Sequence, residues 1–572
     1  MKILLIAINA KYIHSNPAVY SLAAYVNENL TKEEKEKCQI EIGEYTINHR
    51  TESIIADIYK KKPDVLAFSC YIWNWEYVQE IMTELHKLLP KVPIFLGGPE
   101  VSFTSEEIKK QYPFLSGIMV GEGEESFLEL CRAYIENRDV KLVAGISGQP
   151  RGLVNINNIP FFYDDMSAFE HRIVYYESSR GCPYRCSYCL SSIDKTVRLR
   201  DLNLVKKELQ FFLNLKVPQV KFIDRTFNCN RDHACEVWQY IHENDNGITN
   251  FHFEISADIL TGRELSVLEK MRPGLVQLEI GVQSTNAETI KEINRVMNVE
   301  KLRQVVAQIH SFKNIHQHLD LIAGLPYEDY FTFQKSFNEV YSMKPQQLQL
   351  GFLKVLKGAR MWERAADYGI AYTEKPPYEV LFTKWITYDE ILKLKQVEEM
   401  VEMYYNSNQF TYTLSMLEQE FTSSFALYEA LADYYEEKGY ALQNPARSYR
   451  YQILLDFCIE KAPEKEKMYR ELLTFDIYLR EKMKTRPAFA KSQDTIKEIS
   501  REIYQKEEET REFLPSYAEY NSKQISKMTH LEEFLYLVWK QGECKKLTKK
   551  QLIIFDYNER NPLNSECRII LL

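Results

Sequence analysis

Three cysteines within eight residues, Cys182, Cys186 and Cys189, have the spacing C-x3-C-x2-C. Thiolates are soft ligands that suit iron–sulfur clusters or zinc. A structural zinc site normally needs four ligands, and no fourth cysteine or histidine lies nearby in the sequence. Three thiolates on a four-iron cluster would leave one iron free to coordinate a cofactor or substrate. We therefore expect an iron–sulfur centre; the alternatives are a zinc site with a distant fourth ligand and three structural cysteines.

The elements that must position these cysteines alternate between strands and helices over residues 171–360. Helical patterns, for example at 202–215 and 231–243, separate short apolar runs that are typical of buried strands. The expected strands are 174–177, 220–223, 251–256, 276–282, 318–322 and 347–353. Six βα units predict a partial or full βα barrel, whose active site would lie at the C-terminal ends of its strands.

A separate alternation of strands and helices occupies residues 1–145. The expected strands are 3–8, 40–45, 64–69, 93–96 and 117–120. Most are apolar throughout, as strands covered on both faces are, whereas 40–45 alternates and is expected at a sheet edge. This succession predicts a doubly wound, Rossmann-like α/β domain. A polar, proline-containing linker over 146–170 would join it to the barrel over 171–374.

Residues 375–572 differ in composition from the rest of the chain. Only Gly439 and Gly542 occur after Gly369, whereas Glu, Lys, Leu and Tyr are frequent. Helical periodicity at 391–405, 424–438 and 446–461 predicts a mostly α-helical domain over residues 375–540. The segments 552–557 and 568–572 are expected to form a terminal strand pair.

Composition and charge exclude several classes of protein. The 572 residues are 45% hydrophobic and 27% charged, as in globular proteins. With 72 Lys+Arg and 81 Asp+Glu, the net charge of −9 argues against a general nucleic-acid-binding protein. No apolar run reaches the ~18 residues of a membrane-spanning helix, and the odd number of scattered cysteines does not suit a secreted disulfide framework. We expect a cytoplasmic protein.

The cysteine segment resembles the cluster-binding loop of radical S-adenosylmethionine (SAM) enzymes. Tyr188 directly precedes Cys189, and the motif follows the first expected barrel strand. In that superfamily the open iron of a [4Fe-4S] cluster binds the amino and carboxylate groups of SAM, and reductive cleavage yields methionine and a 5′-deoxyadenosyl radical. The resemblance implies that Cys182, Cys186 and Cys189 are the catalytic cluster ligands.

The resemblance also implies where SAM would bind. Residues 279–284 end the fourth strand, where the family has polar SAM contacts, and 320–326 fits the loop along adenine. Carboxylates suit the amine or the hydroxyls of SAM, and Gln or Arg suits its carboxylate. The candidate contacts are Tyr188, Asp224, Arg225, Glu254, Asp258, Glu279, Gln283 and Gly324. A structural hydrogen bond is the alternative for each, and Asp224-Arg225 stands where many relatives have a glycine-rich pair.

A Rossmann-like domain directly before such a barrel resembles the cobalamin-binding class of radical SAM proteins. Glycines at strand ends let backbone approach a flat ligand closely, and such sheets bind ligands at that edge. The candidate cobalamin contacts are Asn9, Tyr12, His14, Ser69, Gly97, Gly98, Gly121 and Glu122. The motif D-x-H-x-x-G, whose histidine ligates cobalt in some relatives, is absent. This favours cobalamin without a protein histidine ligand, with His14 as the alternative lower ligand.

The resemblance implies an enzyme that uses a [4Fe-4S] cluster, SAM and cobalamin to methylate an unactivated carbon of an unknown small-molecule or macromolecular substrate. The alternatives are a rearrangement or oxidation with cobalamin in a non-methylating role, and a corrinoid and iron–sulfur binding protein without turnover. A reductant such as flavodoxin or ferredoxin is the implied partner; a membrane or nucleic acid is not. From Pro376 the chain resembles a domain of unknown function, which would cap the barrel and help to select the substrate.

Overall fold

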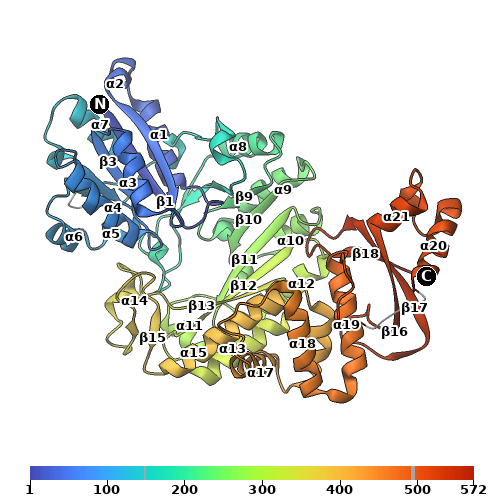
Figure 1. Ribbon diagram of the computed structural model, residues 1–572. Coiled ribbons are helices and arrows are strands. Elements are labelled where there is room, and N and C mark those ends of the chain that lie inside the picture. Colours follow the sequence, from blue (N-terminus) through green and yellow to red (C-terminus); the bar gives the residue numbers. More distant parts are fainter. Residues whose placement is uncertain (147–149, 491–495) are drawn as a thin grey trace.

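The computed structural model describes residues 1–146, 150–490 and 496–572. Figure 1 shows an N-terminal α/β domain, a central sheet with helices along it, and a C-terminal region that packs beside the central sheet. Both large sheets are parallel, so the expected α/β class is confirmed.

The N-terminal domain is built on a five-stranded sheet in the order β2-β1-β3-β4-β5. Its strands are β1 (Lys2–Asn9), β2 (Gln39–Thr46), β3 (Val65–Ser69), β4 (Ile94–Gly97) and β5 (Gly117–Met119). One face is covered by α1 (Pro17–Asn29) and α7 (Glu124–Ile135), the other by α3 (Thr51–Lys60) and α4 (Trp75–Leu88). Three short helices complete it: α2 (Lys32–Lys37), α5 (Pro99–Ser102) and α6 (Ser105–Gln111). The sheet is doubly wound, and β2 lies at its edge, as the sequence predicts.

The central region is a six-stranded parallel sheet in the order β13-β12-β11-β10-β9-β6. Its strands are β6 (Val174–Tyr176), β9 (Gln219–Phe222), β10 (Asn250–Ile255), β11 (Val276–Gln283), β12 (His316–Ala323) and β13 (Gln347–Phe352). The connecting helices are α8 (Leu202–Asn214), α9 (Arg231–Glu243), α10 (Gly262–Glu269), α11 (Ala287–Glu292), α12 (Val299–Phe312) and α13 (Tyr330–Ser342). Among the described residues β6 and β13 do not pair with each other, so the barrel is partial.

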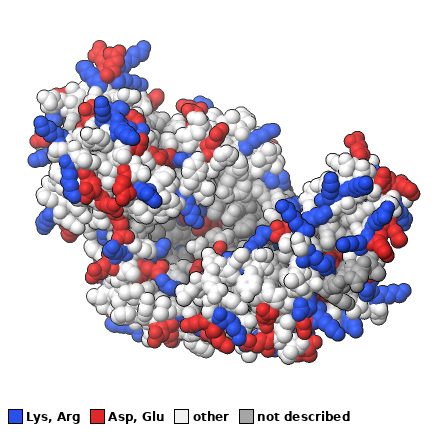
Figure 2. Space-filling model, viewed as in Figure 1, with Lys and Arg blue, Asp and Glu red and all other residues white. Residues whose placement is uncertain are grey.

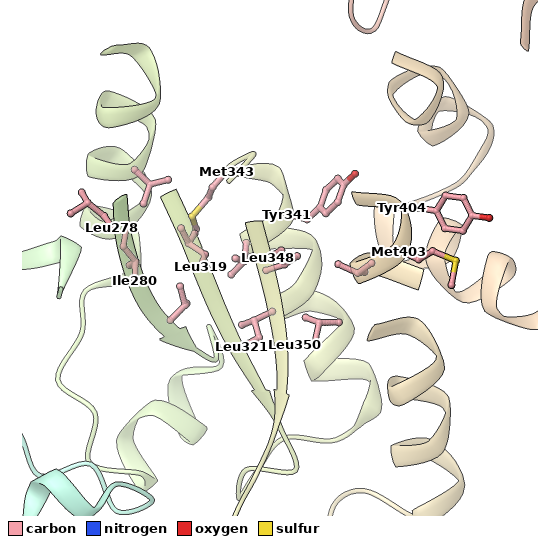
Figure 3. Packing of buried hydrophobic residues seen from close by; sticks show 14 of the residues in the cluster. Leu278, Ile280, Leu319, Leu321, Tyr341, Met343, Leu348, Leu350, Met403 and Tyr404 are labelled. Carbon is pink, nitrogen blue, oxygen red and sulfur yellow. The ribbon is translucent and has the colours of Figure 1, made fainter. Parts of the chain in front are cut away.

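Side chains of the barrel strands alternate between two environments. On β11, Leu278 and Ile280 are fully buried, whereas Glu279 and Gln283 are half-buried on the opposite face. Figure 3 shows the same outward direction for four further leucines of the neighbouring strands, Leu319, Leu321, Leu348 and Leu350. The outer face therefore supplies the apolar core, and polar residues are left to line the interior.

The C-terminal region packs directly on the barrel. It begins with β14 (Ala371–Tyr372) and β15 (Val380–Phe382) and continues with α15 (Tyr388–Met400), a π-helical turn (Val401–Asn406), α16 (Thr411–Leu417), α17 (Ser424–Glu437), α18 (Arg447–Lys461) and α19 (Glu466–Arg480). The side chain of Asn406 accepts a hydrogen bond from the backbone N–H of Leu348 and donates one to its carbonyl oxygen, both at 2.9 Å. Asn406 thus occupies the free edge of β13, which would otherwise expose unpaired backbone groups.

The end of the chain differs from the prediction. After α20 (Ile496–Thr510) and α21 (Ser522–Met528) follow three antiparallel strands, β16 (Thr529–Tyr536), β17 (Lys546–Arg560) and β18 (Cys567–Leu571). The terminal strand pair is confirmed, but residues 529–536, which lie within the span 375–540 expected to be mostly helical, form a strand. Their pattern misleads because the buried Glu532 occupies a core position, paired with Arg486 at 2.7 Å and His530 at 3.0 Å.

Charges of both signs are spread over the surface drawn in Figure 2. Near the end of the chain, Lys550 pairs with Glu533 at 2.5 Å and Lys545 with Glu543 at 3.4 Å.

Within the three described ranges, no helix is both long and apolar enough to cross a membrane.

Candidate active site

The cysteine loop lies at the carboxyl end of β6, between β7 (Ser179–Arg180) and β8 (Arg198–Leu199). Cys182 and Cys186 are each 8% exposed, and Cys189 is half-buried. The backbone N–H of Cys182 donates to the carbonyl of Asp194 at 3.1 Å, and that of Ser187 donates to the carbonyl of Ile293 at 2.9 Å. The three thiols therefore lie in one tethered loop, and this soft donor set fits an iron–sulfur cluster.

Asp224 follows β9 and holds the segment that leads into the loop. It is 1% exposed, and its carboxylate accepts hydrogen bonds from the backbone N–H of Ser178 at 3.0 Å and from the hydroxyls of Ser178 and Ser179 at 2.7 and 2.5 Å. Burial raises the pKa of Asp224 to about 6, despite these hydrogen bonds. The sequence makes Asp224 a candidate SAM contact, whereas the structure commits its carboxylate to positioning the loop.

Asp224→Ala is expected to lower both the free energy of unfolding and the iron content. Three donors would lose a buried acceptor, at a cost of about 1–3 kcal/mol for each group left unsatisfied. Urea unfolding and iron analysis of the reconstituted protein would measure the two effects. Asp232→Ala removes a carboxylate that is exposed on α9 and serves as the control. Unchanged stability with full iron incorporation would contradict the positioning role.

Arg295 was not a candidate from the sequence, yet its guanidinium reaches the cysteine loop. Its Nη1 lies 3.2 Å from Oη of Tyr188 and 3.9 Å from Sγ of Cys186, and Nη2 donates to the carbonyl of Gly281. Burial raises the pKa of the Cys186 thiol, and Arg295 opposes this shift. Arg295 lies 109 residues beyond Cys186, in an irregular segment after α11, so no sequence spacing indicates it.

Gln283 ends β11 in the left-handed region, with φ of 72°. A Cβ at Gly281 would lie 2.4 Å from its Nε2 and 3.4 Å from Nη2 of Arg295, so the glycine leaves space for both side chains. Oε1 of Gln283 and Nε of Arg295 are buried without a hydrogen-bond partner in the described part of the chain. Such orphaned polar atoms beside the cysteine loop fit a polar ligand with amine, carboxylate and hydroxyl groups, as SAM has.

Three further candidate SAM contacts are Arg225, Glu254 and Glu279, of which the last two are opposite each other in the β10–β11 register. Arg225 is exposed just after β9. Burial, together with the neighbouring Glu279, raises the pKa of Glu254 to about 7. Burial opposes ionisation of Glu279 as well, but His252 and Lys221 outweigh it and lower the pKa of Glu279 to about 2.

Two other candidate SAM contacts, Asp258 and Gly324, instead contact other parts of the protein. Asp258 accepts hydrogen bonds from Oγ of Ser256 at 2.8 Å and from the backbone N–H of Asn298 at 2.9 Å. Gly324 packs against β15, where a Cβ would lie 2.7 Å from Cγ1 of Val380. The close approach at Gly324 is thus to the C-terminal region.

The candidate cobalamin contacts lie along the carboxyl edge of the N-terminal sheet. Tyr12 is 59% exposed, whereas Asn9 is 3% exposed and donates to the carbonyl of His14 at 2.9 Å. Nδ1 of His14 lies 2.6 Å from Oη of Tyr175, which belongs to the barrel. The loop after β1 therefore contacts the second domain.

The other candidates end β3, β4 and β5. Ser69 accepts a hydrogen bond from Asn16 at 3.3 Å, and Gly97 and Gly98 are half-buried. Gly121 lies near Pro150. Glu122 is less available than the sequence suggests, because it pairs with Arg198 at 2.5 Å and with Arg180 at 3.5 Å.

An aromatic surface at this edge was not among the candidates. The rings of Tyr71 and Trp73 stack with centroids 4.3 Å apart, and Trp73 is 41% exposed. These two rings offer a partly exposed apolar surface beside the end of β1, where Trp73 donates to the carbonyl of Ile8, and such a surface fits a large flat ligand such as a corrinoid.

Ion pairs bring this edge against the barrel. Arg180 pairs with Glu124 at 2.9 Å, and Lys357 pairs with Glu100 at 2.9 Å. Since Arg180 directly precedes the Gly181–Cys182 turn, the candidate cobalamin edge and the cysteine loop lie on the same side of the barrel.

A cavity of about 710 Å³ adjoins the cysteine loop. Tyr188 and Gln283 line it at the candidate SAM site, Asp320 comes from the barrel interior, and Lys395 and Glu398 come from α15. The C-terminal region therefore supplies part of the wall of this cavity, which also reaches the candidate SAM contacts Tyr188 and Gln283.

Three family models match successive parts of the chain. Residues 3–131 match the B12 binding domain, residues 176–340 the radical SAM superfamily, and residues 366–555 a protein family of unknown function, DUF4080. A radical SAM domain uses a [4Fe-4S] cluster and SAM, and a B12 binding domain binds cobalamin.

Two curated relatives have related descriptions. The chain is 24% identical over 384 residues to an uncharacterized methyltransferase of Pyrococcus horikoshii, covering 63% of this chain and 81% of the relative. It is 26% identical over 442 residues to the cobalamin-dependent radical SAM methyltransferase TokK of Streptomyces tokunonensis, covering 65% of this chain and 62% of TokK. The chain thus matches less than two thirds of the length of TokK.

Two solved structures share the fold of this chain. OxsB, a cobalamin-dependent S-adenosylmethionine radical enzyme, has a TM-score of 0.57 at 14% identity, covering 83% of this chain and 78% of OxsB. The methyltransferase TsrM from Kitasatospora setae has a TM-score of 0.52 at 14% identity, covering 66% of this chain and 78% of TsrM. The three family models together show that the chain joins a B12 binding domain, a radical SAM domain and a C-terminal domain of the DUF4080 family.

Proposed function

We propose that the protein transfers a methyl group to an unactivated carbon of its substrate in a cobalamin-dependent radical SAM reaction. The observation that supports this most is one juxtaposition: the cysteine loop, the carboxyl edge of the B12 binding domain and the cavity ending at Tyr188 and Gln283 lie together. A substrate in that cavity would lie beside the proposed SAM contacts Tyr188 and Gln283. TokK, a relative, is described as a methyltransferase.

When bound, the cluster, SAM and cobalamin supply the electron transfer, the radical and the methyl group. Cys182, Cys186 and Cys189 would bind the cluster as thiolates, and the buried Arg295 favours this form of Cys186. We assign SAM binding to Tyr188, Arg225, Gln283 and Arg295, and cobalamin binding to Tyr12, His14, Ser69, Gly97, Gly98 and Gly121. Glu254 and Glu279, which are opposite each other on β10 and β11, contribute to the polar interior of the barrel.

The C-terminal domain, from residue 375, closes the barrel from the side of β13. Its helix α15 places Lys395 and Glu398 on the cavity wall, where they select the substrate. Water must be excluded because it would compete with the substrate for reactive intermediates. The parts of the chain before this domain are the cobalamin domain at 1–145, the linker at 146–170 and the barrel at 171–374.

The test is an anaerobic incubation of protein reconstituted with iron, sulfide and hydroxocobalamin. SAM with a trideuterated methyl group, dithionite and a metabolite extract would be added. Methyl transfer predicts 5′-deoxyadenosine and S-adenosylhomocysteine together, with a product that contains the trideuterated methyl group. Deoxyadenosine without S-adenosylhomocysteine would indicate a rearrangement or oxidation, and a loaded protein that forms neither would indicate a binding protein.

We also propose that flavodoxin or ferredoxin supplies the electron and that the protein works in the cytoplasm. An oxygen-sensitive cluster on free thiols suits a reducing compartment. Replacing dithionite with enzymatically reduced flavodoxin, and in a second incubation with reduced ferredoxin, would test the partner. No deoxyadenosine with either carrier protein, despite activity with dithionite, would contradict it.

A further inference from the structure

Three side chains able to ligate a metal ion meet inside the barrel. Ligand atoms of Glu279, His318 and Asp320 all lie within 4.8 Å of one another. Glu279 is directly opposite His318 in the β11–β12 register, and Asp320 is the next residue of β12 on the same face. Leu278 and Leu319, their neighbours along the strands, point into the apolar core instead (Figure 3). Strand register therefore brings the three donors together.

Two of these donor atoms have no polar partner outside the group. Nε2 of His318 lies 3.0 Å from Oδ1 of Asp320, within ion-pairing distance, and neither atom has a hydrogen bond with another group in the part of the chain that the structure describes. The His318 side chain is only 8% exposed. Burial of polar atoms with so few partners is costly, and a cation bound to both would lower that cost.

The third donor is held from its other side. Oε2 of Glu279 lies 3.1 Å from Nζ of Lys221 and 2.9 Å from Nε2 of His252. These two neighbours keep the carboxylate ionised and fix its orientation. Supporting contacts of this kind orient the ligands of known metal sites.

We propose that Glu279, His318 and Asp320 bind a divalent first-row transition-metal ion, at a site separate from the iron–sulfur cluster. One imidazole and two carboxylates suit Mn²⁺, Fe²⁺ or Zn²⁺. Ligand atoms about 2.0–2.2 Å from one ion lie at most about 4.4 Å apart, which is close to the limit of 4.8 Å within which these three donors lie. Because Asp320 also lines the cavity, remaining coordination positions would face it, open to an oxygen or nitrogen of the substrate.

The test is a titration of the anaerobically reconstituted holoprotein with Mn²⁺, measuring free Mn²⁺ by its EPR spectrum. Mn²⁺ prefers oxygen and nitrogen ligands to thiolates, so it leaves the cluster in place. We expect one saturable site per chain, which His318→Gln and Asp320→Asn each weaken by roughly 10- to 100-fold. His316→Gln is the matched control, because this half-buried histidine lies two residues earlier on β12 and outside the group.

The visible spectrum of the cluster and the circular dichroism of each variant would establish that the barrel is folded. No saturable Mn²⁺ binding, binding unchanged in both variants, or equal weakening by His316→Gln would overturn the proposal. The titration involves no turnover. Its failure therefore leaves the proposed methyl transfer untouched, and a lack of deoxyadenosine formation would leave the metal site untouched.

Discussion

Cys186→Ala is expected to abolish reductive cleavage of SAM, lowering 5′-deoxyadenosine formation by at least about 10³-fold, as removal of an essential catalytic group does. Cys186 is buried and lies beside Arg295, whose Nη1 is 3.9 Å from its sulfur. Two thiolates cannot replace the three that hold the cluster, and SAM then has no iron to coordinate. Deoxyadenosine would be quantified anaerobically, with iron and sulfide measured in the same sample.

Cys544→Ala is the control for this prediction. Cys544 is a half-buried free cysteine of the C-terminal region outside the cluster motif, so the variant should keep iron and deoxyadenosine formation. If Cys186→Ala retained both, Cys186 would not be a cluster ligand, and the iron site would have to be sought among other cysteines.

Gly98→Ala is expected to lower the melting temperature and to prevent retention of cobalamin. Gly98 has φ of 110°, and a Cβ there would lie 2.4 Å from the carbonyl oxygen of Cys70. The strained backbone costs roughly 1–3 kcal/mol, and the collision with backbone adds to it. The ends of β3 and β4 must then separate, at the edge where cobalamin is proposed to bind. Calorimetry and the visible spectrum after gel filtration would measure the two effects.

The neighbouring Gly97 provides a matched control. A Cβ at Gly97 would lie 3.6 Å from Cβ of Met119, an ordinary contact, so Gly97→Ala should leave the melting temperature unchanged. Loss of cobalamin from this stable variant would indicate that the ligand itself approaches the Gly97 backbone. An unaltered melting temperature for Gly98→Ala would contradict the strain argument.

Much of the architecture could be predicted because it depends on local patterns. Short strand-like runs separated by helical periodicity identified all five strands of the first sheet and all six of the second. Most runs of the first sheet are apolar throughout because both of its faces are covered, whereas the strands of the second sheet alternate between the apolar core and the polar interior. Residues 529–536 were mispredicted because Glu532 is buried in a strand, paired with an arginine 46 residues away. No local pattern contains such a partner.

The sequence by itself determined the three successive parts of the chain and the three-cysteine motif, because a motif and its strand are short-range features. Only the tertiary structure decided which side chains meet around them. Arg295 reaches Cys186, α15 lines the cavity, and Glu279 faces His318 through contacts between residues far apart in the chain. These contacts depend on strand register and on the packing of the C-terminal domain against β13. Burial of the apolar outer faces of the strands sets both the register and this packing. The register then decides which polar side chains of the barrel interior lie opposite one another.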